Sequence, residues 1–203
     1  MKRRWMLGAA LGLGLAGARC SVLPNQPYLQ RHDWPLVVRR PTSVPPRALG
    51  KTLLVRSLQA APGLESRGLR TLQPDGSVRS DFYNQWAVQP ADGVTDDLRR
   101  WLEASGLFAA VLAPGSLVQS QFALEGELTA LHADLANNTA TAALTLVLID
   151  QNPSPVRVLL QKTMRATVGL TGTDPTALVH AQLAALEDLL RQSEAAIAAV
   201  VRK

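Results

Sequence analysis

The sequence has little of several residue types on which common protein scaffolds depend. Cys20 is its only cysteine, so no disulfide can form within the chain. Aromatic residues make up only 4% of the 203 residues, so any core must be built mainly from Leu, Val and Ala. Hydrophobic residues nevertheless reach 47%, which is ample for one buried core in a chain of this length.

An excess of positive charge is also missing from most of the chain, although the formal net charge is +5. Four basic residues (Lys2, Arg3, Arg4 and Arg19) precede Cys20, whereas all 16 acidic residues follow it. The rest of the chain therefore has 17 basic and 16 acidic residues, a net charge of +1. This balance leaves no basic stripe to follow a phosphate backbone, which argues against a nucleic-acid partner.

No apolar run in the sequence is long enough to cross a bilayer, which requires about 20 residues of helix. The run 5–18 is shorter, and the apolar stretch 139–149 ends at Asp150. The first run follows a basic start and ends in small residues, which is the pattern of a secretory signal. We therefore interpret residues 1–19 as a signal peptide.

Cys20, directly after this leader, supports two alternatives. In the first, the chain is cleaved before Cys20, and the thiol carries acyl chains (palmitate among them) that anchor a lipoprotein. An unpaired thiol is otherwise unusual in an oxidising compartment, which favours this alternative. In the second, cleavage follows Ala16-Gly17-Ala18 and releases a soluble periplasmic protein. Arg19 is atypical before a lipidated cysteine, so both alternatives stay open.

The segment 20–50 contains six prolines and shows little periodicity. Because proline fixes φ and removes a hydrogen-bond donor, we expect an extended Pro-rich tether or a coil that follows the edge of the domain. Trp34 and the run 36–38 could dock there as a short edge strand. The periodic sequence that follows predicts one domain over residues 51–203.

The first half of this domain predicts a hairpin and a helix. Strands are expected at 52–58, 68–73 and 77–88, and a Pro-Asp-Gly turn joins the last two. Pro90 begins a helix that runs to Ser105 and ends at the C-cap Gly106. Its apolar face, spaced for a helix, contains Val94, Leu98, Trp101 and Leu102. Another strand is expected at 107–112.

Apolar and polar residues alternate with period two in the second half, which predicts three long antiparallel strands at 121–130, 139–149 and 156–168. Asp174 and Pro175 then begin a final helix as N-cap and first residue. The predicted core contains Leu124, Leu128, Leu144, Leu146, Leu160, Leu183 and Leu186, and the alternation also turns Ala130, Val156 and Val158 inward. The opposite face is predicted to carry Glu125, Glu127, Arg157 and Arg165, with Val147, Ile149 and Leu159.

Together these elements predict an α+β fold. It is a two-layer domain, with a mainly antiparallel sheet and two amphipathic helices packed on one face. The other face of the sheet stays uncovered.

The sequence contains no set of residues with a recognisable catalytic or metal-binding spacing. His32, His132 and His180 are far apart and do not have the spacing of a zinc site. There is no Gly-rich phosphate loop and no GxSxG motif. We therefore expect no cofactor, no metal and no enzymatic activity.

Five segments in a characteristic order carry a family resemblance. They are an early strand Leu53-Leu54-Val55, the break Ala61-Pro62-Gly63, the aromatic segment 81–87, the helix motif Leu98-Arg99-Arg100-Trp101-Leu102, and Gly106-Leu107-Phe108 leading to Val111. With the leader cysteine, this order resembles the ABC-type transport auxiliary lipoprotein family, the PqiC-like lipoproteins associated with MCE-domain lipid transporters. The resemblance covers residues 53–201.

The resemblance implies a non-catalytic lipoprotein subunit of an envelope lipid-transport system. Its partners would be an MCE-domain periplasmic protein and an ABC permease/ATPase complex. It would sit on the periplasmic side of the outer membrane, held by a lipid anchor at Cys20, and could form a homo-oligomeric ring. Two alternatives stay open: a small periplasmic hydrolase with an unlisted site, and an outer-membrane assembly lipoprotein.

Four residues are candidates for contacts with a partner: Tyr83, Trp86, Arg157 and Arg165. Tyr83 and Trp86 lie three residues apart, so a regular strand would expose only one of them. The core interpretation of Trp86 is favoured, with Trp86 closing the sheet onto the first helix. An exposed aromatic would instead be a typical interface anchor. Phe82 and Trp101 are expected in the core.

Overall fold

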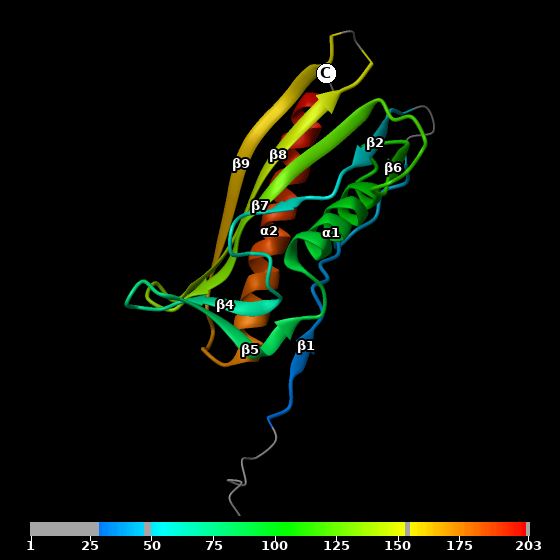
Figure 1. Cartoon of the computed structure of the whole chain (residues 1–203). Helices are drawn as coiled ribbons and strands as arrows, with labels where there is room; N and C mark the ends of the chain where they lie inside the picture. The colour runs from blue at the N-terminus through cyan, green and yellow to red at the C-terminus, as the bar shows by residue number, and fades with distance from the viewer. Residues whose placement is uncertain (1–28, 47–49, 153–154, 202–203) are drawn as a thin grey trace, which may run out of the picture.

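The computed structural model describes residues 29–46, 50–152 and 155–201 (Figure 1). The leader and Cys20 lie outside these residues. The predicted α+β class is confirmed: two helices, α1 (Pro90–Ala104) and α2 (Pro175–Val201), accompany a mixed, mainly antiparallel sheet that has nine strands in the described chain. Neither helix in this part of the chain is long and apolar enough to cross a membrane.

The three predicted long strands form one side of the sheet. They are β7 (Phe122–Asp134), β8 (Thr139–Asp150) and β9 (Arg157–Gly169), and they pair antiparallel in chain order. The other edge of β7 pairs in parallel with three short strands, one after another: β2 (Thr52–Val55), β3 (Gln59–Ala60) and β4 (Gly68–Leu72). β7 is therefore hydrogen-bonded on both edges along most of its length.

Three further strands extend the sheet. β5 (Val78–Trp86) pairs antiparallel with β4 across the predicted turn, and β1 (His32–Trp34) pairs in parallel with β5. β6 (Ala110–Leu112) pairs in parallel with β2. Figure 1 shows β1 and β5 at one end of the molecule and β2 and β6 toward the other.

Both helices pack on one face of the sheet and share a single main core. Trp101 on α1 is only 1% exposed, and its indole N–H donates to Glu194 on α2 at 2.8 Å. Five of the seven predicted core leucines are fully buried, and Leu160 and Leu183 are partly buried against the same core. Burial of these aliphatic side chains is the main stabilising contribution to the fold.

The starts of both helices and the end of α1 agree with the sequence predictions. The Asp174 carboxylate accepts the backbone N–H groups of Thr176 and Ala177 at 3.0 and 3.1 Å, so it caps the start of α2. α1 begins at Pro90, and Gly106 just beyond its end has a φ of +65°. A left-handed residue there suits glycine, because other residues would have a strained Cβ.

The Pro-rich segment follows the edge of the domain between His32 and Val44. Leu36 and Val38 are 3% and 6% exposed and belong to the main core. The backbone N–H of Val44 donates to the Ala104 carbonyl at the end of α1, at 2.9 Å. The described part of this segment is thus packed against α1, and we call residues 32–44 the N-terminal strap.

A buried carboxylate on α1 holds the strap. Asp97 is 1% exposed, and its Oδ2 accepts the backbone N–H of Val38 at 2.9 Å. Burial raises the pKa of Asp97 to about 7, because desolvation of the charged form outweighs the hydrogen bond from Val38 and the charge of Arg39. The strap covers this carboxyl group and removes it from water.

Ionisation of Asp97 therefore makes stability depend on pH. The raised pKa means that the folded protein holds this proton more tightly than the unfolded chain, so stability falls as pH rises from about 4 through about 7. Asp97→Asn should flatten this decline, because the amide oxygen can still accept the Val38 N–H. Urea denaturation at a series of pH values measures the effect. Asp96→Asn, on the surface of the same helix, should keep the wild-type pH dependence.

Candidate functional site

One face of β7, β8 and β9 is covered by neither helix of the described chain. Glu125, Val147 and Gln161 lie opposite one another across the three strands, as do Glu127, Thr145 and Thr163. Thr145 and Thr163 share a hydrogen bond at 2.9 Å between their hydroxyl oxygens, and Glu125 pairs with Arg56 at the end of β2. This surface, the open face, mixes charged, hydroxyl and aliphatic side chains.

A β-bulge in β9 corrects the predicted alternation. Leu160 opposes Leu148 and Val158 opposes Ile149, so Leu159 is the extra residue. Val158 is therefore turned to the open face and is 56% exposed, whereas Leu159 packs against the core. The inward prediction was wrong for Val158, and for Val156, which precedes the strand and is 61% exposed.

The same bulge separates two of the predicted site residues. Arg165 opposes Ala143 on the open face, whereas Arg157 opposes Asp150 beyond the bulge. Because the bulge reverses the alternation, strand parity places Arg157 on the face opposite to Arg165, at the far end of β9. Both arginines are exposed, but the structure does not bring them together on one surface.

A second bulge, at Thr129 in β7, lies beside a hollow of about 200 Å³ on the open face. Its register places Ala130 opposite Ala143 on this face, contrary to prediction, although Ala130 is buried, as predicted, at 6% exposed. Leu131, which opposes Ala142, takes the inward position. Arg70 and His132 line the hollow. Burial and the charges of Arg165 and Arg70 lower the pKa of His132. Arg70 and Arg165 thus lie close enough to His132 to disfavour its charged form.

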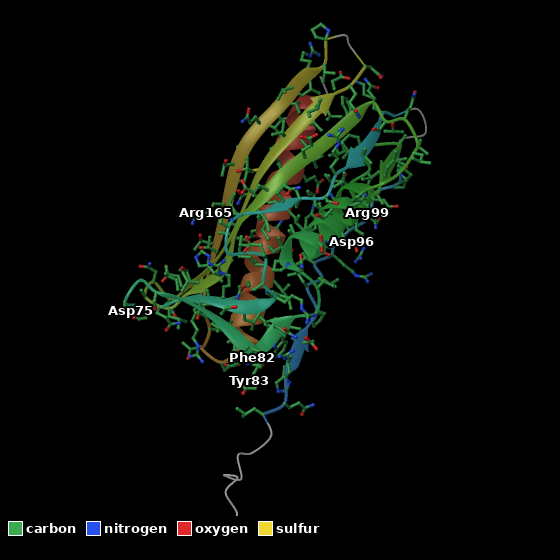
Figure 2. The ribbon with its side chains drawn as sticks, in the orientation of Figure 1. Asp75, Phe82, Tyr83, Asp96, Arg99 and Arg165 are labelled. Atoms are coloured by element: carbon green, nitrogen blue, oxygen red, sulfur yellow. The ribbon has the colours of Figure 1, made fainter. Side chains whose placement is uncertain are left out.

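Tyr83 and Trp86, the predicted aromatic candidates, are in different environments. Trp86 is 1% exposed and belongs to the core, as the favoured interpretation had it, whereas Tyr83 is 41% exposed. Phe82 is 67% exposed, so its predicted place in the core was wrong. Figure 2 shows Phe82 and Tyr83 together at the β1–β5 end of the molecule.

The irregularity in β5 has a local cause. The register between β4 and β5 moves from Arg70↔Ser80 to Gly68↔Gln85, so residues 81–84 leave the ladder. The Asp81 carboxylate accepts the backbone N–H groups of Tyr83 and Asn84 at 2.8 and 3.1 Å, which closes a tight Asx-type turn. The turn extrudes Phe82 and Tyr83. The sequence signal for this turn was Asp81 itself, because an Asp side chain commonly accepts the backbone N–H two residues later, here that of Tyr83.

The described residues offer little for chemistry. No group of three His, Asp or Glu side chains among them could hold a metal ion. Asp96 pairs with Arg99 and Arg100 on the surface of α1, and Arg191 pairs with Glu187 and Asp188 on α2. These helix-surface carboxylates are engaged in exposed ion pairs.

Comparisons with known proteins identify the family and the fold. A family model described as "ABC-type transport auxiliary lipoprotein component" matches residues 36–193. No curated protein matches the sequence at a significant level. Among solved structures, the protein XCC0632 of Xanthomonas campestris, from family DUF330, is 23% identical with a TM-score of 0.70, covering 84% of this chain and 96% of that one. The hypothetical protein CT253 of Chlamydia trachomatis is 11% identical with a TM-score of 0.54, covering 75% and 98%.

The extruded aromatic turn should depend on Gly68. A Cβ at Gly68 would lie 2.3 Å from the Ser80 hydroxyl oxygen and 2.5 Å from the Asp81 carbonyl oxygen. Gly68→Ala should therefore force the turn away from β4 and lower the free energy of unfolding by about 1–3 kcal/mol. Gly169→Ala is the matched control, since nothing lies within 4 Å of its added Cβ. Equal stability of the two variants in urea denaturation would contradict this account of the turn.

Proposed function

The chain belongs to the ABC-type transport auxiliary lipoprotein family, and from this membership we propose that it is the lipoprotein subunit of an MCE-type envelope lipid transporter. The observation that carries the proposal is the family match over residues 36–193, which spans most of the strap, β2 to β9, α1 and most of α2. In this role the chain links the periplasmic conduit, formed by an MCE-domain protein, to the outer membrane.

The proposed role is non-catalytic. Hydrolysis of ATP belongs to the ATPase subunit of the transporter, because the sequence has no Gly-rich phosphate loop of its own. The engagement of the helix-surface carboxylates in ion pairs is consistent with a part that binds and positions other proteins. Affinity purification of the chain from solubilised membranes tests the assignment. The permease, the ATPase and an MCE-domain protein should co-purify, and their absence would contradict it.

The proposed attachment to the membrane is through acyl chains on Cys20. Acyl chains contribute about 0.8 kcal/mol per buried CH₂, and two or more chains hold a protein stably where one does not. Ser21, in place of Asp, directs such a lipoprotein to the outer membrane by analogy with lipoprotein sorting. From Cys20 the chain reaches the strap, which is joined to α1 by the hydrogen bond from Val38 to Asp97. A pull on the anchor is thus transmitted directly to the helical layer.

The anchor gives a direct prediction. Cys20→Ser should move the protein from the membrane fraction to the soluble periplasm, because the acyl chains can no longer be attached. Cell fractionation measures this shift, and mass spectrometry of the mature N-terminus identifies the acyl chains in the wild type. A free N-terminal peptide beginning at Arg19 would rule out the anchor.

The proposed contact with partners is through the open face and the edge of β9. In the described chain β9 pairs only with β8, so its outer edge presents unpaired backbone N–H and C=O groups. Such an edge is a template for contact with another chain. If that contact is with a second copy, head-to-tail repetition closes into a ring that could surround the end of a transport conduit.

Charge reversal tests this surface. Arg165→Glu should weaken self-assembly or binding of the MCE-domain protein by roughly tenfold or more. The reason is that a negative side chain would replace the positive charge that the partner surface complements. Arg157→Glu tests the end of the β9 edge separately, because Arg157 lies on the opposite face of the sheet. Light scattering and pull-down measure the two effects, and the melting temperature should stay nearly unchanged. Arg191→Glu, on the exposed side of α2, is the control that should assemble normally.

A further inference from the structure

The extruded turn in β5 presents an aromatic pair to solvent. Phe82 and Tyr83 are 67% and 41% exposed, and their ring centroids lie 5.3 Å apart in an edge-to-face arrangement. The Cζ atom of Arg31, just before β1, lies 4.4 Å from the centroid of the Phe82 ring. Leu29, two residues earlier, is 60% exposed. We call Leu29, Arg31, Phe82 and Tyr83 the aromatic patch.

Retention of two aromatic side chains in water is unfavourable in a protein that has so few. Burial of a Phe side chain stabilises a fold, and this chain buries Trp86, Trp101, Phe108 and Phe122 almost completely. The Asp81 turn holds Phe82 and Tyr83 out of the core. Their geometry is therefore built into the fold, and it prepares a surface for something other than this domain.

The position of the patch identifies what can cover it. β1 pairs with β5 in the register His32↔Asn84, so the chain enters the domain directly beside the extruded turn. Cys20 is nine residues before Leu29, a distance of at most about 30 Å of extended chain. A membrane that holds acyl chains on Cys20 must therefore lie within reach of this end of the molecule. Figure 2 shows Phe82 and Tyr83 at this end, beside β1.

We propose that the aromatic patch is a membrane-contact site that enters the headgroup layer of the bilayer in which the chain is anchored. The proposal rests on the acylation of Cys20 but not on the identity of the transporter. Aromatic side chains with a polar tip, such as Tyr83, favour the membrane–water interface, and Phe82 and Leu29 supply apolar area. The guanidinium of Arg31 suits a phospholipid phosphate, to which it can donate two parallel hydrogen bonds.

This contact orients the domain. With two points of attachment, the acylated N-terminus and the aromatic patch, the β1–β5 end faces the bilayer. The opposite end, toward which Figure 1 shows β2 and β6, then points away from the membrane. The open face of β7, β8 and β9 runs between these two ends and stays free for protein contacts. An anchor at one point alone would leave the orientation of the domain unspecified.

A depth measurement tests the patch. The acylated full-length variant Phe82→Trp is bound to vesicles of phosphatidylethanolamine and phosphatidylglycerol, with or without bromine on the acyl chains. Leu117→Trp is the matched control, because Leu117 is 100% exposed in the loop after β6, away from the patch. The wild-type chain supplies the background emission of Trp34, Trp86 and Trp101. Brominated lipid should quench most of the emission added by Phe82→Trp and almost none of that added by Leu117→Trp.

A second measurement uses the rate at which the acylated chain transfers from one vesicle to another. Phe82→Ser combined with Tyr83→Ser should speed transfer roughly ten- to a hundred-fold, because the buried apolar area is lost. Leu117→Ser should leave the rate unchanged. Both substituted sites are exposed, so the fold should persist, and the melting temperature verifies this.

The outcomes separate the patch from the anchor and from the transporter. A wild-type chain that does not sediment with vesicles overturns both the anchor and the patch. If the chain sediments but the Phe82→Trp emission is not quenched, the membrane-contact proposal alone is overturned. The aromatic pair would then be a surface for a protein partner. Neither assay contains transporter subunits, so these results are independent of whether the MCE-domain protein co-purifies with the chain.

Discussion

β7 is hydrogen-bonded along both edges while one of its faces is buried, and the positions of the other elements follow from this constraint. β8 occupies one edge, and β2, β3 and β4 occupy the other in succession. Both helices cover the face that carries Phe122, Leu124 and Leu128, each at most 1% exposed. Gly126 lies between them, where a Cβ would be 2.3 Å from the Thr145 carbonyl oxygen. The absence of a side chain there lets Leu146 fill the centre of the core.

The same strand explains why the two faces of the sheet differ so sharply. A strand with both edges paired cannot shift its register without breaking two ladders at once, so each side chain has one possible face. Single-residue bulges at Thr129 and Leu159 are the points where the faces exchange. They bring Ala130 and Val158 to the open face, where the hollow beside His132 also lies. The composition of the open face is thus decided by two residues that lie outside the ladder.

The N-terminal strap connects this architecture to the proposed role. A lipid anchor on a free linker would hold the domain near a membrane without orienting it. Here the strap is packed on α1 through Leu36 and Val38, and the carboxyl group of Asp97 is buried beneath it. Arg40 extends the contact to α2, where its Nε donates to Glu194 at 3.0 Å. The strap, which follows the proposed anchor in the sequence, is therefore part of the folded unit, and the aromatic patch lies where the strap begins.

The sequence alone determined the fold class, both helices and their caps, the three long strands, and most of the leucine core. These features depend on local periodicity, which the covalent chain carries within windows of ten to twenty residues. It did not determine the faces of Val158 and Ala130, the exposure of Phe82 or the burial of Asp97. Each of these depends on a partner distant in sequence: β8 beside the bulges, Gly68 beside the β5 turn, and the strap over α1. Only the tertiary structure brings such partners together. Pairing between strands that are distant in sequence decides where the inward–outward alternation reverses, and packing of the strap on α1 removes the Asp97 carboxyl group from water.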